Sequence, residues 1–335
     1  MNDEHDAVER KVQLTGGSTY TVSLPKDWAT SQDIEPGTTV TLYSQGQQVV
    51  ITRGSDPTTR RHTTTIRAGE RNPATLALAI GSAYRAGCDE IRIEDVRERT
   101  QRRAVTRAVG GFVGLEVITE DETCLVARTM LDVADLSPEQ TLSQLERTTL
   151  EMHERAVQAV TTCNADLGEE IAHQDETVDR LFALVSRGFH QSLVDPSVTM
   201  GTEPLTPFEY YVAARQLERV ADHAEKIATT ATRLSDPPPE DLAETLLRAG
   251  EQSRELLQRA LSGLLTPPRE GSDDLEDVLA DTDEVLTELA AMDEQVYRRQ
   301  LADSYLLGLA VDSLVRTTRY GRNIAESALV VRHRG

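Results

Sequence analysis

Lysine, aromatic residues and cysteine are all scarce in this sequence of 335 residues. Only three of the 35 basic residues are lysines, so nearly all positive charge comes from arginine. Aromatic residues make up 4% of the chain, and a core must therefore be built from Leu, Val, Ile and Ala. The three cysteines, Cys88, Cys124 and Cys163, are odd in number and lack CxxC spacing. This pattern excludes a disulfide framework and a cysteine-based zinc site, and it indicates reduced thiols.

Long apolar runs are also missing. No stretch approaches the roughly 18 apolar residues that a membrane-spanning helix needs, so we expect no membrane insertion. The first residues, MNDEHDAVERK, are acidic and lack the apolar segment of a signal peptide. The sequence therefore predicts a cytoplasmic protein.

Negative charge is in large excess, with a formal net charge of -21. An acidic surface that keeps arginine and loses lysine suits a cytoplasm near molar salt, where the Debye length is about 3 Å and repulsion between acids is weak. The sequence therefore predicts a halophile protein. Residues 1–54 contain 7 acids and 4 bases, residues 55–130 contain 11 acids and 12 bases, and residues 131–335 contain the other 38 acids and 19 bases. Any part that approaches an anion should thus lie in the first 130 residues.

The first 130 residues have a mixed pattern. Apolar and polar residues alternate around Gly16–Gly17 and again around Gly46, which predicts two β-hairpins, with a short helix at KDWATSQ between them. From 61 to 130 the pattern predicts the order β-α-β-α-β-β. Asn72 and Pro73 should cap the first of these helices, which should end at Gly87, and the second should cover 97–109.

After residue 137 the signals for strands disappear, and the pattern predicts four to six long helices. We expect breaks at Gly168 and in the proline-containing segments 196–207, 237–239 and 267–272. LERVADHAEKIA (217–228) and LVRTTRYGRNIA (314–325) align at an offset of 97 residues. Each would be the last helix of a three-helix unit, which favours duplicated three-helix bundles.

Two stretches resemble known families. RKVQLTGGSTYTVSLPKDWA, followed by DIEPGTTVTLYSQGQQVVIT, resembles AbrB/SpoVT swapped-hairpin domains; DETVDRLFALVSRGF, followed by ARQLERVADHAEKIA, resembles PhoU, the phosphate-uptake regulator. The whole chain is similar to archaeal, here haloarchaeal, PhoU-like regulators. This resemblance implies a multidomain fold with an AbrB-like swapped-hairpin β domain at 8–54, a small α/β connector at 61–131, and a C-terminal all-α pair of PhoU-like three-helix bundles at 138–234 and 238–332.

The resemblance also implies a function. A PhoU-type regulator restrains phosphate transport and phosphate-responsive genes, and an AbrB-like domain makes a homodimer that commonly binds DNA. The alternative is an adaptor that docks on the phosphate ABC transporter ATPase, with the AbrB-like domain only dimerising. An enzyme is not expected, because no nucleophile–base grouping, Walker-A motif or GxGxxG pattern is legible.

PhoU proteins hold metal ions with ExxxD or DxxxD carboxylates, and the resemblance places this role on Asp175, Asp179, Glu218 and Asp222. A spacing of four puts each pair on one helix face, at the margin of the buried side. Carboxylates favour hard cations such as Mg, Ca or Mn, and relatives are associated with Fe and Zn. The alternative is that all four are solvated acids of an acidic surface.

In the second repeat, Val315 and Arg319 stand where Glu218 and Asp222 stand in the first. We therefore expect at most one metal centre per chain, in the first bundle. His223 points about 100° away from Asp222 and is predicted to be a helix-surface histidine.

Two basic groups are candidates for binding anions. For DNA these are Arg10, Lys11 and Lys26 of the AbrB-like segment, although this segment is net negative and could serve dimerisation alone. A second group lies along the 97–109 helix, where the alternative is solvation or pairing with Glu94, Asp95 and Glu98. Its members share one face and could bind phosphate or the DNA backbone: Arg99, Arg102, Arg103 and Arg107.

Overall fold

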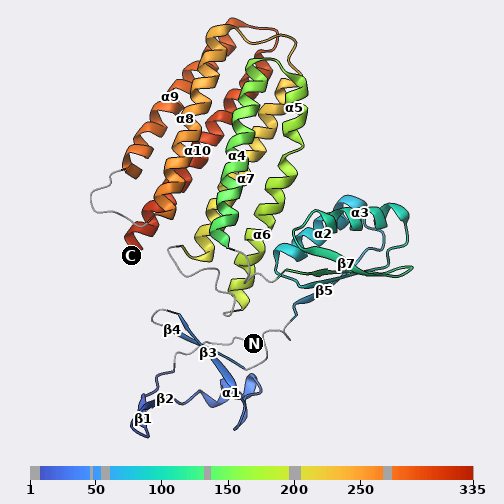
Figure 1. Ribbon diagram of the computed structural model, residues 1–335, viewed down its shortest axis with the longest axis vertical. Coiled ribbons are helices and arrows are strands. Elements are labelled where there is room, and N and C mark those ends of the chain that lie inside the picture. Colours follow the sequence, from blue (N-terminus) through green and yellow to red (C-terminus); the bar gives the residue numbers. More distant parts are fainter. Residues whose placement is uncertain are drawn as a thin grey trace. The chain divides into compact units, whose positions relative to one another are not determined.

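A computed structural model of the chain describes residues 8–45, 48–53, 61–131, 137–195, 205–266 and 274–334 (Figure 1). The chain divides into two compact units, Met1–Arg60 and Arg61–Gly335. In the described ranges, no helix is both long enough and apolar enough to cross a membrane.

The first unit consists of two β-hairpins and a short helix. β1 (Gln13–Thr15) pairs with β2 (Thr19–Thr21), and the turn between them uses Gly16 and Gly17, both with positive φ. α1 (Lys26–Ser31) follows, and then β3 (Val40–Gln45) pairs with β4 (Gln48–Arg53). These elements confirm the predicted hairpins and helix, while the turn predicted at Gly46 falls outside the described residues.

The described side chains of the first unit do not form a buried core. Along 8–44 and 48–53 every side chain is at least partly exposed. Tyr20 is 77% exposed, and its cross-strand partner Leu14 is 61% exposed. On the second hairpin, Leu42 and Val49 are also exposed. The hairpins therefore leave apolar surface that the described residues of this unit do not cover.

The second unit begins with the predicted β-α-β-α-β-β order, which the structure confirms. Its elements are β5 (Thr63–Arg67), α2 (Pro73–Arg85), β6 (Glu90–Glu94), α3 (Arg99–Gly110), β7 (Leu115–Glu120) and β8 (Leu125–Thr129). The strand order is β5-β6-β8-β7, with β5 parallel to β6 and the other pairs antiparallel. Asn72 caps α2 as predicted, because its side chain accepts a hydrogen bond of 2.8 Å from the Thr75 backbone N–H.

This sheet packs its apolar side chains against α2 and α3, which lie along it in Figure 1. Ile91 and Ile93 alternate with exposed or half-buried residues on β6, as a strand with one buried face requires. Leu76 and Ile80 of α2 and Val105 of α3 cover them.

Seven helices complete the described part of the second unit. They are α4 (Pro138–Thr161), α5 (Ala165–Ala172), α6 (Asp175–Val194), α7 (Pro207–Ala231), α8 (Glu240–Leu265), α9 (Asp274–Arg299) and α10 (Ser304–Arg334). One continuous apolar core runs through them. The two repeated segments, 217–228 and 314–325, lie on α7 and α10, and these two helices pack against each other near the middle of the bundle (Figure 1).

The helix break predicted at Gly168 is wrong. Gly168 lies inside α5, and the chain turns earlier, at Cys163, whose φ of 52° is in the left-handed region. A Cβ on Gly168 would lie 2.5 Å from the carbonyl oxygen of Ala228 on α7. Glycine is thus needed here for close approach of two helices. A further break, at Gln300 between α9 and α10, was not predicted.

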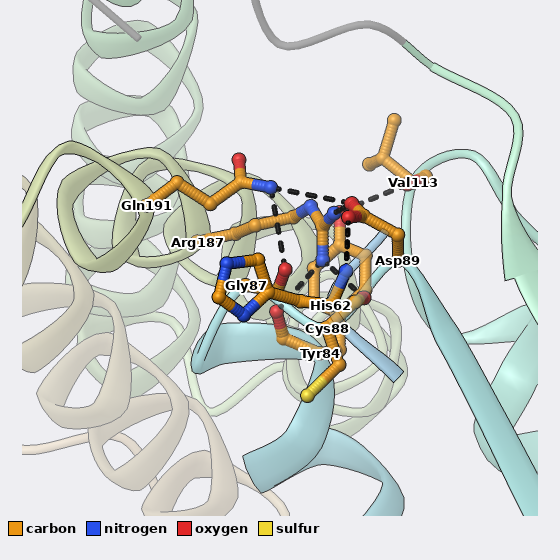
Figure 2. A network of polar contacts seen from close by, with 8 residues as sticks. All are labelled: His62, Tyr84, Gly87, Cys88, Asp89, Val113, Arg187 and Gln191. Atoms are coloured by element: carbon orange, nitrogen blue, oxygen red, sulfur yellow. Dashed lines mark hydrogen bonds and ion pairs between the residues drawn. The ribbon is translucent and has the colours of Figure 1, made fainter. Parts of the chain in front are cut away.

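Arg187 of α6 joins the helices to the sheet domain (Figure 2). Its side chain is 1% exposed, and its guanidinium donates to the backbone carbonyls of Tyr84 and Cys88 at 3.2 and 2.6 Å. It also forms an ion pair of 2.6 Å with Asp89, which in turn accepts a hydrogen bond from the His62 backbone N–H. The junction between α2, β6 and α6 is therefore polar and directional, with a buried arginine at its centre.

Gly87 makes this junction possible at the end of α2. Its φ of +89° is one that other residues rarely adopt, and a Cβ there would lie 2.6 Å from the Gln191 side chain. Gln191 donates to the Gly87 carbonyl at 3.3 Å (Figure 2). The predicted end of α2 at Gly87 is thus correct, and the same glycine also admits a side chain from α6.

Candidate functional site

The four carboxylates singled out in the sequence lie on two adjacent helices. Asp175 and Asp179 occupy the first turns of α6, and Glu218 and Asp222 lie in the middle of α7. On α6, Val178 and its apolar neighbours at helical spacing face the core, as expected. This packing brings the two pairs toward each other along the α6–α7 seam, which we call the carboxylate seam.

Asp175 is the most perturbed member of the carboxylate seam. Burial raises the pKa of its carboxyl to about 7, with further increases from the negative charges of Asp179, Glu225, Asp222 and Glu218. Its Oδ1 atom is buried and has no hydrogen-bond partner. An ionised carboxylate here is thus poorly compensated by the protein.

Glu218 differs from the sequence prediction, which placed it at the margin of the core. It is 9% exposed, so it is buried. Its Oε1 accepts a hydrogen bond of 2.8 Å from Arg215, while its Oε2 is buried without a partner. Burial raises its pKa to about 7, Asp222 adds to the shift, and Arg215 opposes it. Close packing of α6 on α7 buries this position more than a helical wheel of α7 alone indicates.

Asp179 and Asp222 complete the carboxylate seam. Burial raises the pKa of both, and the charge of Asp222 raises the pKa of Asp179 further. Lys226 is the largest influence that lowers the pKa of Asp222. Because the charge of Asp222 raises the pKa of the other three carboxyls, the four share one electrostatic neighbourhood, although Asp175 and Glu218 are 43 positions apart in the sequence.

Buried carboxylate oxygens without partners, together with raised pKa values, are suited to a hard cation, which would supply the missing positive charge. Among the residues that the structure describes, however, no three His, Cys, Asp or Glu side chains lie close enough together to hold a metal ion. The metal centre therefore remains a prediction.

The second repeat has no carboxylates at the two positions that match Glu218 and Asp222. Val315 packs against the core at the first of these positions, and Arg319 is exposed at the second.

His223 is not the surface histidine predicted from the sequence. It is 9% exposed, its ring lies 5.7 Å from that of Tyr320 on α10, and its Nδ1 is buried without a partner. Burial lowers its pKa to about 4. Packing of α10 over α7 buries this side of the helix, which a three-helix unit taken alone would leave open.

His153 of α4 is a second buried histidine, which sequence analysis missed. It is fully buried, and burial lowers its pKa to about 3, with smaller effects from Arg254 and His223. Arg254 of α8 lies 3.4 Å from its Nδ1. Helices α4 and α7 of the first repeat and α8 of the second thus surround two buried histidines, His153 and His223. The sequence has no HxxxH spacing that would predict this grouping.

The four candidate arginines of α3 differ in their contacts and exposure. Arg102 forms an ion pair of 2.5 Å with Glu120 and donates to the carbonyls of Asp121 and Glu122. It holds the β7–β8 turn against α3 and is not available to an anion, which corrects the prediction for this residue. The partner is Glu120, not the acids before the helix that were considered as alternatives. The other three remain exposed: Arg99, Arg103 and Arg107.

The three candidate DNA-binding residues lie in the first unit and are exposed. Arg10 and Lys11 precede β1, and Lys26 begins α1. Arg10 donates to the Glu9 carbonyl. No described contact engages the two lysines, so their charges are open to solvent.

Comparison with known proteins supports the architecture. Residues 142–231 match the PhoU domain, and residues 13–58 match the bacterial antitoxin MazE, described as antidote-toxin recognition. The first match covers α5, α6 and α7 and most of α4, and it includes the whole carboxylate seam. No match is found among curated proteins.

Two solved structures are similar to the helical part. The phosphate transport system regulatory protein PhoU from Streptococcus pneumoniae aligns with a TM-score of 0.50 at 16% identity, over 59% of this chain and 94% of that one. PhoU from Pseudomonas aeruginosa aligns with a TM-score of 0.42 at 18% identity, over 59% and 96%. The first similarity shows a shared fold. The chain thus has a small N-terminal β unit followed by an α/β domain and helices of the PhoU fold.

Proposed function

We propose that this protein is a PhoU-type regulator that negatively regulates phosphate transport and phosphate-responsive genes. The observation that carries the proposal is the PhoU-domain match over 142–231, in a chain of which 59% shares its fold with 94% of a bacterial PhoU. The proposal assigns no catalytic residues.

The first unit would supply dimerisation and DNA contact. Its match to an antitoxin domain and its uncovered apolar hairpins both favour pairing with a second copy of the chain. Arg10, Lys11 and Lys26 would then appear twice in the dimer, which doubles the positive charge available to phosphates of DNA.

The helical part would dock on regulatory partners, including the ATPase of a phosphate ABC transporter. The carboxylate seam would bind one divalent or transition-metal ion, such as Mg, Mn, Zn or Fe. That ion would compensate Asp175 and Glu218, whose buried oxygens lack partners, and would be held by the carboxylates of α6 and α7.

A DNA-binding measurement tests the regulatory half of the proposal. Fluorescence anisotropy of full-length protein with its own upstream DNA and with phosphate-transporter promoters, in molar KCl, should show specific binding. Lys11→Ala/Lys26→Ala should abolish it. Lys226→Ala is a matched control, because it removes the remaining lysine, which is exposed on α7 of the second unit.

The second candidate function is an adaptor without DNA contact, favoured by the net charge of -3 over residues 1–54. Absence of DNA binding in the unsubstituted protein, with dimerisation intact, would favour it. Capture of the purified transporter ATPase by the Lys11→Ala/Lys26→Ala variant would then support docking through the helices. Absence of both activities would reject the proposed function.

A further inference from the structure

A cleft of about 470 Å³ opens where the sheet domain meets α6. Its lining comes from the end of α2, the end of α3 with the residues that follow it, and the first turns of α6. The lining residues are Arg85, Arg107, Gly110, Gly111, Phe112, Glu176, Asp179 and Arg180. Three arginines from three helices thus face one space, which we call the arginine cleft.

These three arginines differ from the other arginines without a polar partner, such as Arg103 on α3, because all three line one cleft. In the described part of the chain, neither Arg85, Arg107 nor Arg180 makes a hydrogen bond or an ion pair. Arginines elsewhere commonly pair, as Arg128 does with Glu90. The Nε of Arg85 is also buried without an acceptor. A buried donor without an acceptor is costly, and an anion bound in the cleft would compensate the charge of this guanidinium.

The position of Arg85 is fixed by the packing beneath it. Its guanidinium carbon lies 5.8 Å from the centre of the Phe112 ring, which stacks on Tyr84 at 4.7 Å. A Cβ on Gly81 would lie 2.9 Å from this phenyl ring and 3.3 Å from Arg85. The Arg187 guanidinium lies 5.2 Å from the centre of the Tyr84 ring. The floor of the arginine cleft is therefore tightly packed, which preorganises it for a ligand.

The charges of the lining favour an anion of a particular kind. Three arginines against Glu176 and Asp179 leave one net positive charge, in a chain whose residues 131–335 are strongly acidic. Guanidinium groups present paired N–H donors that match phosphate oxygens. Gly110 and Gly111 carry no side chain, so no side chain fills the cleft at these two positions. Asp179 also belongs to the carboxylate seam, so a bound anion would lie beside the predicted cation site.

We infer that the arginine cleft binds a phosphate-class oxyanion, inorganic phosphate or a phosphate monoester, through Arg85, Arg107 and Arg180. The presence of an anion site follows from the cleft, whereas the choice of phosphate over other oxyanions rests on the proposed function. Because the arginines come from α2, α3 and α6, the ligand would tie the sheet domain to the first helices and could report phosphate to the helical surface.

Isothermal titration calorimetry on the full chain in molar KCl tests this inference with inorganic phosphate, sulfate and glycerol 3-phosphate. Phosphate should bind, and Arg107→Gln and Arg180→Gln should each weaken it by about tenfold or more, as expected for loss of a charge-assisted contact. Arg147→Gln is the matched control, since this arginine is also exposed, lies on α4 and does not line the cleft. Its affinity should stay within about twofold of the parent.

Several outcomes would overturn the inference. Binding of none of the three anions rejects the site, as does binding that the two cleft variants leave unchanged. Sulfate binding as tightly as phosphate supports an oxyanion site but rejects phosphate as its specific ligand, and tighter binding of glycerol 3-phosphate identifies a monoester. DNA binding retained in a protein that fails to bind phosphate would reject this inference alone and leave the proposed function standing.

Discussion

The two units of this chain differ in how far their apolar side chains are buried. In the second unit, Leu217, Val220 and Ile227 of α7 are almost completely buried within one continuous core. In the first unit, Tyr20 and Leu42 are mostly exposed on hairpins whose strands are three and six residues long. Hairpins of this size rarely bury enough surface to be stable alone. The second unit buries its apolar side chains within itself, whereas the described hairpins leave apolar surface that the proposed dimer would cover.

The largest expected effect tests this contrast directly. Tyr20→Asp/Leu42→Asp should convert the proposed dimer to a monomer, because it places charge on the apolar faces of both hairpins. Light scattering after gel filtration would measure the mass, and circular dichroism at 222 nm would follow the helices, which should melt unchanged. Leu247→Asp, on an exposed position of α8, is the control and should leave the mass unaltered. A dimer that survives the double substitution would contradict the assignment of dimerisation to the first unit.

A smaller effect should follow from breaking the junction inside the second unit. Arg187→Ala would leave Asp89 and two backbone carbonyls without their buried donor, at a cost of about 3 kcal/mol in the free energy of unfolding. Hydrogen exchange should rise at residues 84–89, while the helices far from the junction stay protected.

The matched control for the junction is Arg298→Ala, which removes an exposed ion pair with Glu294 on α9. That change should cost no more than about 0.5 kcal/mol. Equal losses in the two variants, or unchanged exchange at 84–89 in Arg187→Ala, would show that the sheet domain does not depend on this arginine.

The smallest effect concerns the carboxylate seam and pH. Asp175 and Glu218 have folded-state pKa values of about 7, above their ordinary values of 3.8 and 4.5. They therefore bind protons more tightly when folded, so their contribution to stability is complete below about pH 4 and is lost as pH rises through 7. With EDTA present, we expect this loss to be about 1–2 kcal/mol for the pair, because Asp175 is only partly buried.

Thermal melts between pH 5 and 8 measure this dependence. Asp175→Asn/Glu218→Gln should flatten it, and Glu244→Gln, an exposed glutamate of α8, should not. A divalent cation added at pH 8 should raise the melting temperature of the parent and not of the double variant. A melting temperature that rises with pH in the parent and is unaffected by any cation would contradict both the pKa shifts and the metal proposal.

Much of the fold could be predicted from local sequence signals. Asn72–Pro73 and Gly87 mark the ends of α2 through capping and left-handed backbone, and these depend only on nearby residues. Apolar alternation located the strands in the same way. The break predicted at Gly168 failed because the glycine serves a contact with α7, and a distant contact leaves no local signal.

The site could be predicted only in part, for a related reason. A helical wheel places Glu218 and His223 relative to one helix, but α6 and α10 add burial that one helix cannot reveal. His153 and Arg254 meet across helices from the two repeats. Arg187 gave one usable signal, a charged residue within the apolar run LFALVSRGF, which indicates a buried partner.

The Arg187 junction also bears on how this protein can change over evolutionary time. Two of its hydrogen bonds end on main-chain carbonyls, which every amino acid supplies, and only Asp89 contributes an accepting side chain. Substitutions at exposed positions of the sheet domain therefore leave those acceptors intact. The sheet domain can diversify its exposed residues, and with them its ligands or partners, while its attachment to the helices is inherited unchanged.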